Sequence, residues 1–173
     1  AACGRDHEGR WALERLTDCG VDVFLHEVDD VTGQCVVVVE GDGTRTMLSD
    51  AGANARISEV ADDIWRSVVD QTSRGGAPLH VHVSGYLLER DSLLASRLLA
   101  MLHELAPSST TSLDTAALPP TASHRAGITA ALPFLDVLIG TQDELVDLAF
   151  PTPPHVASAD LPESDAIDRW RKT

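Results

Sequence analysis

The chain has 173 residues, of which 43% are hydrophobic and 23% are charged, and its net charge is −14 at pH 7. This length and composition are typical of one folded domain and exclude a chain that is disordered throughout. The large negative charge argues against binding to nucleic acid or to an anionic membrane, because both require a basic surface.

The first fifty residues predict a helix and several short strands. The expected elements are a strand end over 1–4, a helix over 8–18, and strands over 21–28, 34–40 and 44–48. The helix has apolar residues at helical spacing, and Gly20 follows its end, where glycine is common. The β-branched run Val36–Val39 and the turn Gly41-Asp42-Gly43 together indicate a β-hairpin.

The rest of the chain alternates between helices and strands. Helices are expected over 59–71, 91–105, 123–132 and 142–149, and strands over 79–83, 110–113 and 136–139. Ser58 is the expected N-cap of the first of these helices. From residue 79 onward, the repeated order of strand and helix predicts a doubly wound parallel sheet. Residues 151–173 are expected to form a loop and a charged helical tail.

Polar and small residues follow the predicted parallel strands at the edge where such sheets bind ligands. Gly85, Asp114 and Glu144 each stand just after a strand. The two carboxylates are well placed to meet a sugar hydroxyl or a magnesium-bound water. Position alone favours a structural explanation, in which Asp114 caps a turn and Glu144 is a solvated residue in the first turn of a helix.

Two further sets of residues have candidate metal or redox roles. His80 and His82 alternate along a strand and therefore share one face, where they are better explained as a polar pair than as metal ligands. Three cysteines lie far apart, without the spacing of a disulfide framework or a zinc site. This pattern favours a reducing, cytoplasmic environment.

Several familiar catalytic motifs do not occur in the sequence. It contains no G-x-G-x-x-G after a strand, no G-x-x-x-x-G-K-[ST] and no G-x-S-x-G. These absences argue against a Rossmann oxidoreductase, a P-loop enzyme and an α/β-hydrolase.

A series of short motifs resembles the pfkB family of carbohydrate kinases, which have a ribokinase-like fold. The matching segments, in chain order, are Gly4-Arg5-Asp6-His7-Glu8-Gly9, Cys19-Gly20-Val21-Asp22, Thr32-Gly33, Gly41-Asp42-Gly43-Thr44-Arg45-Thr46, Ala51-Gly52-Ala53-Asn54-Ala55, His82-Val83-Ser84-Gly85-Tyr86, Ser112-Leu113-Asp114 and Asp136-Val137-Leu138 leading to Glu144. Each segment is weakly specific. Their order and spacing over about 150 residues make the resemblance specific as a set.

The resemblance implies an α/β, ribokinase-like fold. Its features would be a doubly wound, mostly parallel sheet with helices on both faces, and a small β-sheet lid. The whole chain, 1–173, would be one partial domain. The lid would occupy about 21–50, and the α/β core would occupy about 1–20 and 51–150.

The resemblance also implies ATP-dependent phosphoryl transfer to a hydroxyl group of a sugar or nucleoside, with Mg²⁺. Asn54, Gly85 and Asp114 would contact the substrate, while Thr141 and Glu144 would serve the nucleotide and metal. Thr141 stands where the family's N-x-x-E motif has asparagine, so this position can offer a hydroxyl group but no amide.

The family's G-A-G-D segment, which supplies the catalytic base and the anion-binding N–H groups, does not occur in the sequence. Both chain ends are also typical of a fragment. We therefore expect a central piece of a carbohydrate kinase that is inactive alone and carries no catalytic base. The alternative is a non-catalytic binding or dimerisation module of the same fold, in which the β-lid forms a homodimer.

Overall fold

The computed structural model describes residues 1–74, 79–89, 91–116 and 121–150, and these residues form two compact units. The first unit contains Ala1–Leu79 and Ala100–Ser109, and the second contains the described residues of His80–Leu99 and Thr110–Thr173. The loop and tail expected over 151–173 lie outside the described residues.

The first unit begins with strand β1 (Ala2–Gly4) and helix α1 (His7–Asp18). Asp6 caps the helix, because its side chain accepts a hydrogen bond from the Gly9 N–H, and Gly20 follows the helix end with φ +75°. The predicted helix is confirmed, including the glycine just past its end.

The strand expected over 21–28 is much shorter in the structure. Strand β2 covers only His26–Val28 and pairs in parallel with β1, with Cys3 opposite Glu27. Residues 21–25 have no regular secondary structure. Because β1 has only three residues, only three residues of the following segment can pair with it. The segment assigned to the lid therefore contributes its end to a different sheet.

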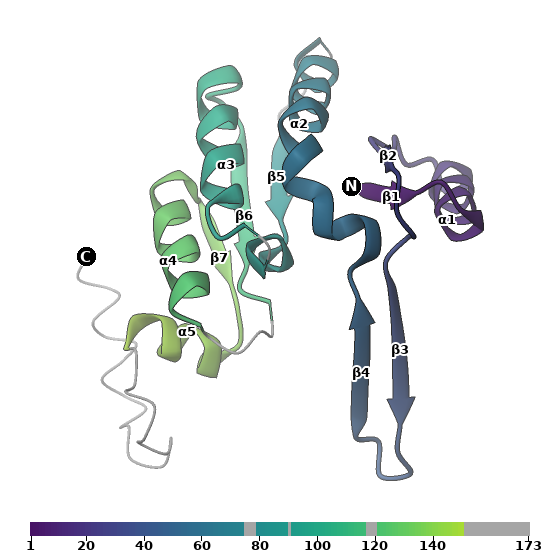
Figure 1. Cartoon of the computed structure of the whole chain (residues 1–173). Coiled ribbons are helices and arrows are strands. Elements are labelled where there is room, and N and C mark those ends of the chain that lie inside the picture. The colour runs from purple at the N-terminus through teal and green to yellow at the C-terminus, as the bar shows by residue number, and fades with distance from the viewer. Residues whose placement is uncertain (75–78, 90, 117–120, 151–173) are drawn as a thin grey trace. The chain divides into compact units, whose positions relative to one another are not determined.

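The predicted hairpin is confirmed and forms a two-stranded antiparallel sheet (Figure 1). Strand β3 (Gln34–Val39) pairs with β4 (Arg45–Asp50), and Val37 lies opposite Met47. Gly43 takes φ +88° in the turn, where glycine has no steric penalty. All residues of both strands are exposed.

A 3₁₀ helix, η1 (Gly52–Arg56), leads directly into helix α2 (Ile57–Arg74). The prediction that Ser58 caps α2 is wrong, because the helix begins at Ile57, two residues earlier than expected, and Ser58 is its second residue. The Ala51 end of η1 has no side-chain cap. One face of α2 is buried through Ile57, Val60, Ala61 and Val69.

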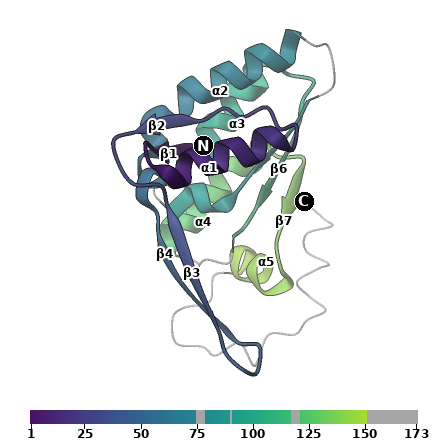
Figure 2. The same cartoon turned by 90° about the vertical axis from the view of Figure 1, so that its right-hand side faces the viewer.

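The second unit is built on a three-stranded parallel sheet in the order β5-β6-β7. The strands are β5 (His80–Val83), β6 (Thr110–Asp114) and β7 (Val137–Ile139), and Figure 2 shows β6 and β7 side by side. Leu113 lies opposite Val83 on one side and Leu138 on the other, and its side chain is fully buried. The parallel order predicted from the sequence is confirmed.

Helices lie between the strands of this sheet along the chain, and one more follows β7. They are η2 (Gly85–Glu89), α3 (Leu94–Leu105), α4 (Ala122–Ala131), η3 (Leu132–Phe134) and α5 (Gln142–Ala149). Helix α3 begins later than expected because Asp91 accepts a hydrogen bond from the Leu93 N–H in a turn before the helix. Leu94, Leu99 and Ile128 are among the most buried side chains. No helix within the described ranges is long and apolar enough to cross a membrane.

Candidate active site

Asp114 joins the ends of β5 and β6. Its Oδ1 atom accepts hydrogen bonds from the Ala116 N–H (2.9 Å) and the Gly85 N–H (3.3 Å), and its Oδ2 atom lies 3.1 Å from Nε2 of His82. The explanation that Asp114 caps a turn is therefore confirmed. A carboxylate has about four acceptor positions, so the described residues leave one position on Oδ2 for a ligand.

Gly85 is required by the close approach of the two strand ends. A Cβ atom at this position would lie 2.4 Å from the backbone oxygen of Asp114 and 2.8 Å from the carbonyl carbon of Thr115. The space beside the glycine is therefore filled by the protein's own backbone. The expected contact between Gly85 and a substrate stays a prediction, and it would have to use another side of the residue.

The turn after β6 is held in an uncommon conformation. Ala116 has φ +48°, a left-handed conformation that costs a non-glycine residue about 1–3 kcal/mol. Two hydrogen bonds stabilise the turn, from the Ala116 N–H to Asp114 and from the Thr115 N–H to the carbonyl oxygen of Ile139 (2.8 Å). The polar groups at the end of β6 are thus fixed in place.

Thr141 and Glu144 form a capping box at the start of α5. Oε2 of Glu144 accepts from the Thr141 N–H (2.8 Å), and the Glu144 N–H donates to Oγ1 of Thr141 (3.4 Å). Thr141, which stands where the N-x-x-E motif has asparagine, therefore still serves as the N-cap of α5. The structural explanation of Glu144 as a first-turn residue fits this geometry.

Thr115 connects this capping box to β6, and the sequence analysis did not identify it. Its hydroxyl group donates to Oε2 of Glu144 (2.7 Å). The Thr141 N–H, followed by the Thr115 hydroxyl, lowers the pKa of Glu144 below its usual value. Glu144 is therefore ionised at neutral pH, and the hydrogen bonds that its carboxylate accepts from described residues all use Oε2. Its Oε1 atom is left for a ligand.

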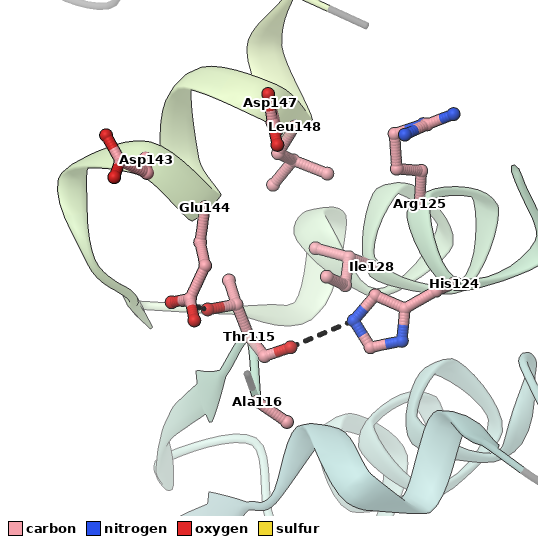
Figure 3. A pocket seen from close by; sticks show the side chains of 9 residues that line it. All are labelled: Thr115, Ala116, His124, Arg125, Ile128, Asp143, Glu144, Asp147 and Leu148. Carbon is pink, nitrogen blue, oxygen red and sulfur yellow. Dashed lines mark hydrogen bonds between the residues drawn. The ribbon is translucent and has the colours of Figure 1, made fainter. Parts of the chain in front are cut away.

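A small cavity lies where the end of β6 meets α4 and α5 (Figure 3). Its volume is about 100 Å³, which is room for several water molecules. It is lined by Thr115, Ala116, His124, Arg125, Ile128, Asp143, Glu144, Asp147 and Leu148. The cavity can therefore accommodate water next to Glu144.

His124 forms one wall of the cavity and was not predicted. Its ring is buried, and Nε2 donates to the carbonyl oxygen of Thr115 (2.9 Å), as Figure 3 shows. Nδ1 is also buried and has no hydrogen-bond partner within the described part of the chain. A histidine in the first turn of a helix gave no sequence signal for this role.

The donor set fits a magnesium ion that is bound mainly by phosphate. Among residues 1–74, 79–89, 91–116 and 121–150, no three histidine, cysteine, aspartate or glutamate side chains are placed to hold a metal ion. Mg²⁺ usually keeps several waters and takes only one or two carboxylates together with substrate phosphates. Glu144, with one carboxylate oxygen left, meets that limited requirement.

Asn54 lies in η1, in the first unit, whereas the other predicted site residues lie in the second. It is exposed, and its side-chain nitrogen lies 3.1 Å from the position that a Cβ of Gly33 would take. The structure thus places Gly85, Asp114, Thr141 and Glu144 at neighbouring strand ends. The substrate role of Asn54 stays a prediction.

Comparison with known proteins identifies the family to which this arrangement belongs. Residues 1–166 match the sequence profile described as pfkB family carbohydrate kinase. The chain belongs to the pfkB family. A comparison with curated proteins gave no match.

Solved structures share the pfkB-family fold of this chain. Adenosine kinase from Anopheles gambiae, in complex with P1,P4-di(adenosine-5) tetraphosphate, is 22% identical with a TM-score of 0.68. Ribokinase from Giardia lamblia is 16% identical with a TM-score of 0.69, and ribokinase from Cryptococcus neoformans var. grubii, in complex with ADP, is 23% identical with a TM-score of 0.57. Each alignment covers 86% of this chain and 42% of the other. The chain therefore spans less than half the length of these proteins.

These comparisons confirm the ribokinase-like α/β fold predicted from the sequence. Within a pfkB-family kinase, the carboxyl ends of the parallel strands are the edge at which an open α/β sheet binds its ligand. Asp114 and Glu144 stand at this edge in the second unit.

Proposed function

We propose that this chain forms the lid and part of the substrate and nucleotide sites of a kinase that transfers a phosphoryl group from ATP to a sugar or nucleoside hydroxyl. The observation that carries the proposal is the pair of strand-end carboxylates, Asp114 and Glu144, in a pfkB-family chain. Each is held by several hydrogen bonds and keeps acceptor positions that no described residue uses.

The two carboxylates have different proposed roles. Asp114 accepts a substrate hydroxyl at its remaining position on Oδ2, because the rest of the carboxylate is used by Gly85, Ala116 and His82. Glu144 accepts from a water of the Mg²⁺–ATP complex through Oε1, while Thr141 and Thr115 hold the other oxygen. Mg²⁺ supplies charge neutralisation for the phosphates when it is bound.

Asn54 and Gly85 complete the proposed substrate contacts. The hairpin β3–β4 closes over the substrate and excludes water, which limits ATP hydrolysis. No G-A-G-D segment occurs in residues 1–173, so we propose that a segment outside this sequence provides the base that takes the hydroxyl proton. By this proposal, residues 1–173 alone transfer no phosphoryl group.

The direct test is a coupled assay of ADP release by the full-length protein with Mg²⁺–ATP and a panel of sugars and nucleosides. The panel includes ribose, fructose, 2-keto-3-deoxygluconate and adenosine. The proposal expects at least one acceptor to stimulate ADP release and to be recovered as its phosphate ester. Uniform inactivity of a folded full-length protein across the panel contradicts the kinase proposal.

Glu144 provides a narrower test of the nucleotide site. We expect Glu144→Gln in the full-length protein to lower magnesium-dependent activity by about 10- to 100-fold, the usual effect of losing an outer-shell metal partner. The matched control is Glu104→Gln, which removes the same charge from an exposed position on α3. Equal magnesium dependence of the two variants would return Glu144 to a purely structural role.

A second candidate function is a dimerisation module of the same fold. The observation that favours it is the β3–β4 hairpin, in which Val36, Val37, Val39 and Leu48 are 48–67% exposed. Apolar residues at consecutive positions on a strand place apolar surface on both faces of the sheet. A hairpin with two apolar faces can close over a substrate with one face and pair with a second copy through the other.

A further inference from the structure

A row of five polar side chains crosses β5 and β6 on one face of the sheet. His80 lies between Thr110 and Ser112, and His82 lies between Ser112 and Asp114. The parallel register places His80 opposite Thr110 and His82 opposite Ser112, which brings all five side chains to the same face. Every imidazole nitrogen in the row therefore has a partner.

The distances describe a continuous chain of hydrogen bonds. His80 Nδ1 is 2.8 Å from Thr110 Oγ1, and His80 Nε2 is 2.9 Å from Ser112 Oγ. His82 Nδ1 is 2.8 Å from the same Ser112 oxygen, and His82 Nε2 is 3.1 Å from Asp114 Oδ2. Ser112 is only 3% exposed, so solvent has little access to the central link.

When both rings are neutral, the donors and acceptors that each group can offer fix the direction of every hydrogen bond in the row. An ionised carboxylate only accepts, so His82 Nε2 carries the hydrogen and His82 Nδ1 must accept from the Ser112 hydroxyl. Ser112 has then used its only hydrogen, so its oxygen accepts from His80 Nε2. His80 Nδ1 in turn accepts from the Thr110 hydroxyl. All four hydrogens point along the row toward Asp114.

We propose that this row is a directional hydrogen-bond relay, in which His82 is a positioning residue for Asp114 and the ring tautomer of His80 depends on Asp114. The relay itself is independent of the kinase proposal. Its consequence for substrate binding rests on the proposed function, because Asp114 holds the substrate hydroxyl there. His82 and two backbone N–H groups together fix the plane of the carboxylate.

Asp114→Asn tests the relay, because the relay predicts a change at His80, whereas a purely local effect would stop at His82. The Oδ1 position receives two backbone N–H groups, from Gly85 and Ala116, so the amide oxygen of asparagine must occupy it. The amide NH₂ then faces His82 Nε2, which must become an acceptor. Each hydrogen bond in the row reverses as a result, and His80 changes from the Nε2–H to the Nδ1–H tautomer.

The experiment is ¹⁵N NMR of the histidine rings in the full-length protein at about pH 8.5, where an ordinary imidazole is neutral. Single His→Gln substitutions assign the signals. The wild-type protein is expected to show one tautomer, Nε2–H, for both rings, and Asp114→Asn is expected to show Nδ1–H for both. Adding Ser112→Ala to Asp114→Asn is expected to release His80, but not His82, from the single Nδ1–H form, because His80 then keeps only the Thr110 hydroxyl, which can donate or accept.

Two outcomes would overturn the relay. The first is a His80 ring that stays Nε2–H in folded Asp114→Asn. The second is a mixture of tautomers at His80 or His82 in the wild-type protein, and this measurement keeps the proposal falsifiable if Asp114→Asn does not fold. Neither result requires kinase activity, so a failure of the relay is distinguishable from a failure of the proposed function.

The positioning role of His82 has its own readout once an acceptor substrate is known. His82→Leu is expected to raise KM for that acceptor about tenfold while kcat changes less than about twofold. His82→Gln is expected to rescue KM, because a glutamine amide can donate to Asp114 where leucine cannot. Equal KM values for the two variants contradict the positioning role even if the enzyme is active.

Discussion

Asp6 shows how a single side chain connects distant segments of the first unit. Its Oδ1 atom accepts from the Gly9 N–H (2.9 Å) and the Thr32 hydroxyl (2.6 Å), and its Oδ2 atom accepts from the Thr32 N–H (2.6 Å). The Thr32 side chain, followed by the Thr32 and Gly9 backbone, lowers the pKa of Asp6 to about 2. The carboxylate thus ties the start of α1 to the segment that enters β3.

One prediction at the residue scale concerns how acid affects the hydrogen bonds of Asp6. The pKa of Asp6 is lower in the folded chain than its usual value of 3.8, so the ionised form stabilises the fold above that value. This stabilisation is lost as the pH falls through about 2. We expect Asp6→Asn to lower the free energy of unfolding at pH 7, and the difference from wild type to shrink between pH 4 and pH 2.

Urea unfolding at a series of pH values measures both quantities. Asp22→Asn is the control, because it removes the same charge from an exposed position. A difference between Asp6→Asn and wild type that stays constant from pH 7 to pH 2 would show that the ionised hydrogen bonds do not stabilise the fold.

A second prediction at the residue scale concerns Gly85. An alanine there places its Cβ 2.4 Å from the backbone oxygen of Asp114, so the two strand ends must separate. We expect Gly85→Ala to lower the free energy of unfolding by about 1–3 kcal/mol, as overpacking usually does. Gly41→Ala is the control, because no described residue beyond its chain neighbours has an atom within 4 Å of the added Cβ, and it should change the value by less than about 1 kcal/mol. Equal effects would contradict the packing argument.

The sequence was informative about which residues stand at the strand ends and less so about their partners. Asp114 ends β6 and Glu144 follows β7, and both positions are visible in the hydrophobic pattern although Val137 and Ile139 of β7 are exposed. Thr115, which donates to Glu144, and His124, which donates to the Thr115 carbonyl oxygen, meet only because α4 and α5 approach the end of β6. The pattern of residue types along one sequence does not specify how helices pack against a strand.

At the scale of elements, capping residues determined how closely a predicted helix start agreed with the structure. The helix expected over 142–149 has those bounds in the structure, because Thr141 and Glu144 form a capping box three residues apart. Ser58 also resembled an N-cap, but a 3₁₀ helix already precedes α2 there. The serine hydroxyl therefore had no helix end to cap.

The hairpin provides the prediction at this scale. In the proposed lid-mediated dimer, we expect Val37→Lys, in the middle of β3, to weaken self-association of the full-length protein at least tenfold, because a lysine must be desolvated in an apolar contact. Sedimentation equilibrium measures the dissociation constant.

Gln34→Lys is the matched control for charge. It adds the same positive charge to an already polar end of β3. Because the chain is acidic, charge alone would favour association in both variants. If Val37→Lys associates as tightly as Gln34→Lys, the hairpin is not the dimer interface.

At the scale of the whole molecule, the fold class was the strongest prediction from sequence. The alternating strands and helices after residue 79 indicated a parallel sheet, and the structure has one, with the strands in the order β5-β6-β7. The division into two units was not foreseen, since α3 has residues in both and its hydrophobic pattern is continuous. Alternation of elements indicates topology, whereas the grouping of elements depends on tertiary contacts.

The net charge of −14 makes a prediction for the same proposed dimer. Two acidic copies repel each other, and the screening length falls from about 10 Å at 0.1 M salt to about 3 Å at 1 M. We therefore expect the dissociation constant of the full-length protein to decrease as sodium chloride is raised over this range. An increase with salt would mean that ion pairs, rather than apolar contacts, hold the dimer together.

The base of the hairpin has a mechanical consequence. The segments entering β3 and leaving β4 touch as bare backbone, because a Cβ at Gly33 would lie 2.5 Å from the oxygen of Ala51, and one at Gly52 would lie 2.4 Å from the oxygen of Val31. Each strand has six residues and is therefore about 20 Å long. The hairpin is thus long, and its base is narrow. One methyl group added at Gly33 or Gly52 would change the direction of the hairpin and move its far end by much more than the width of the methyl group.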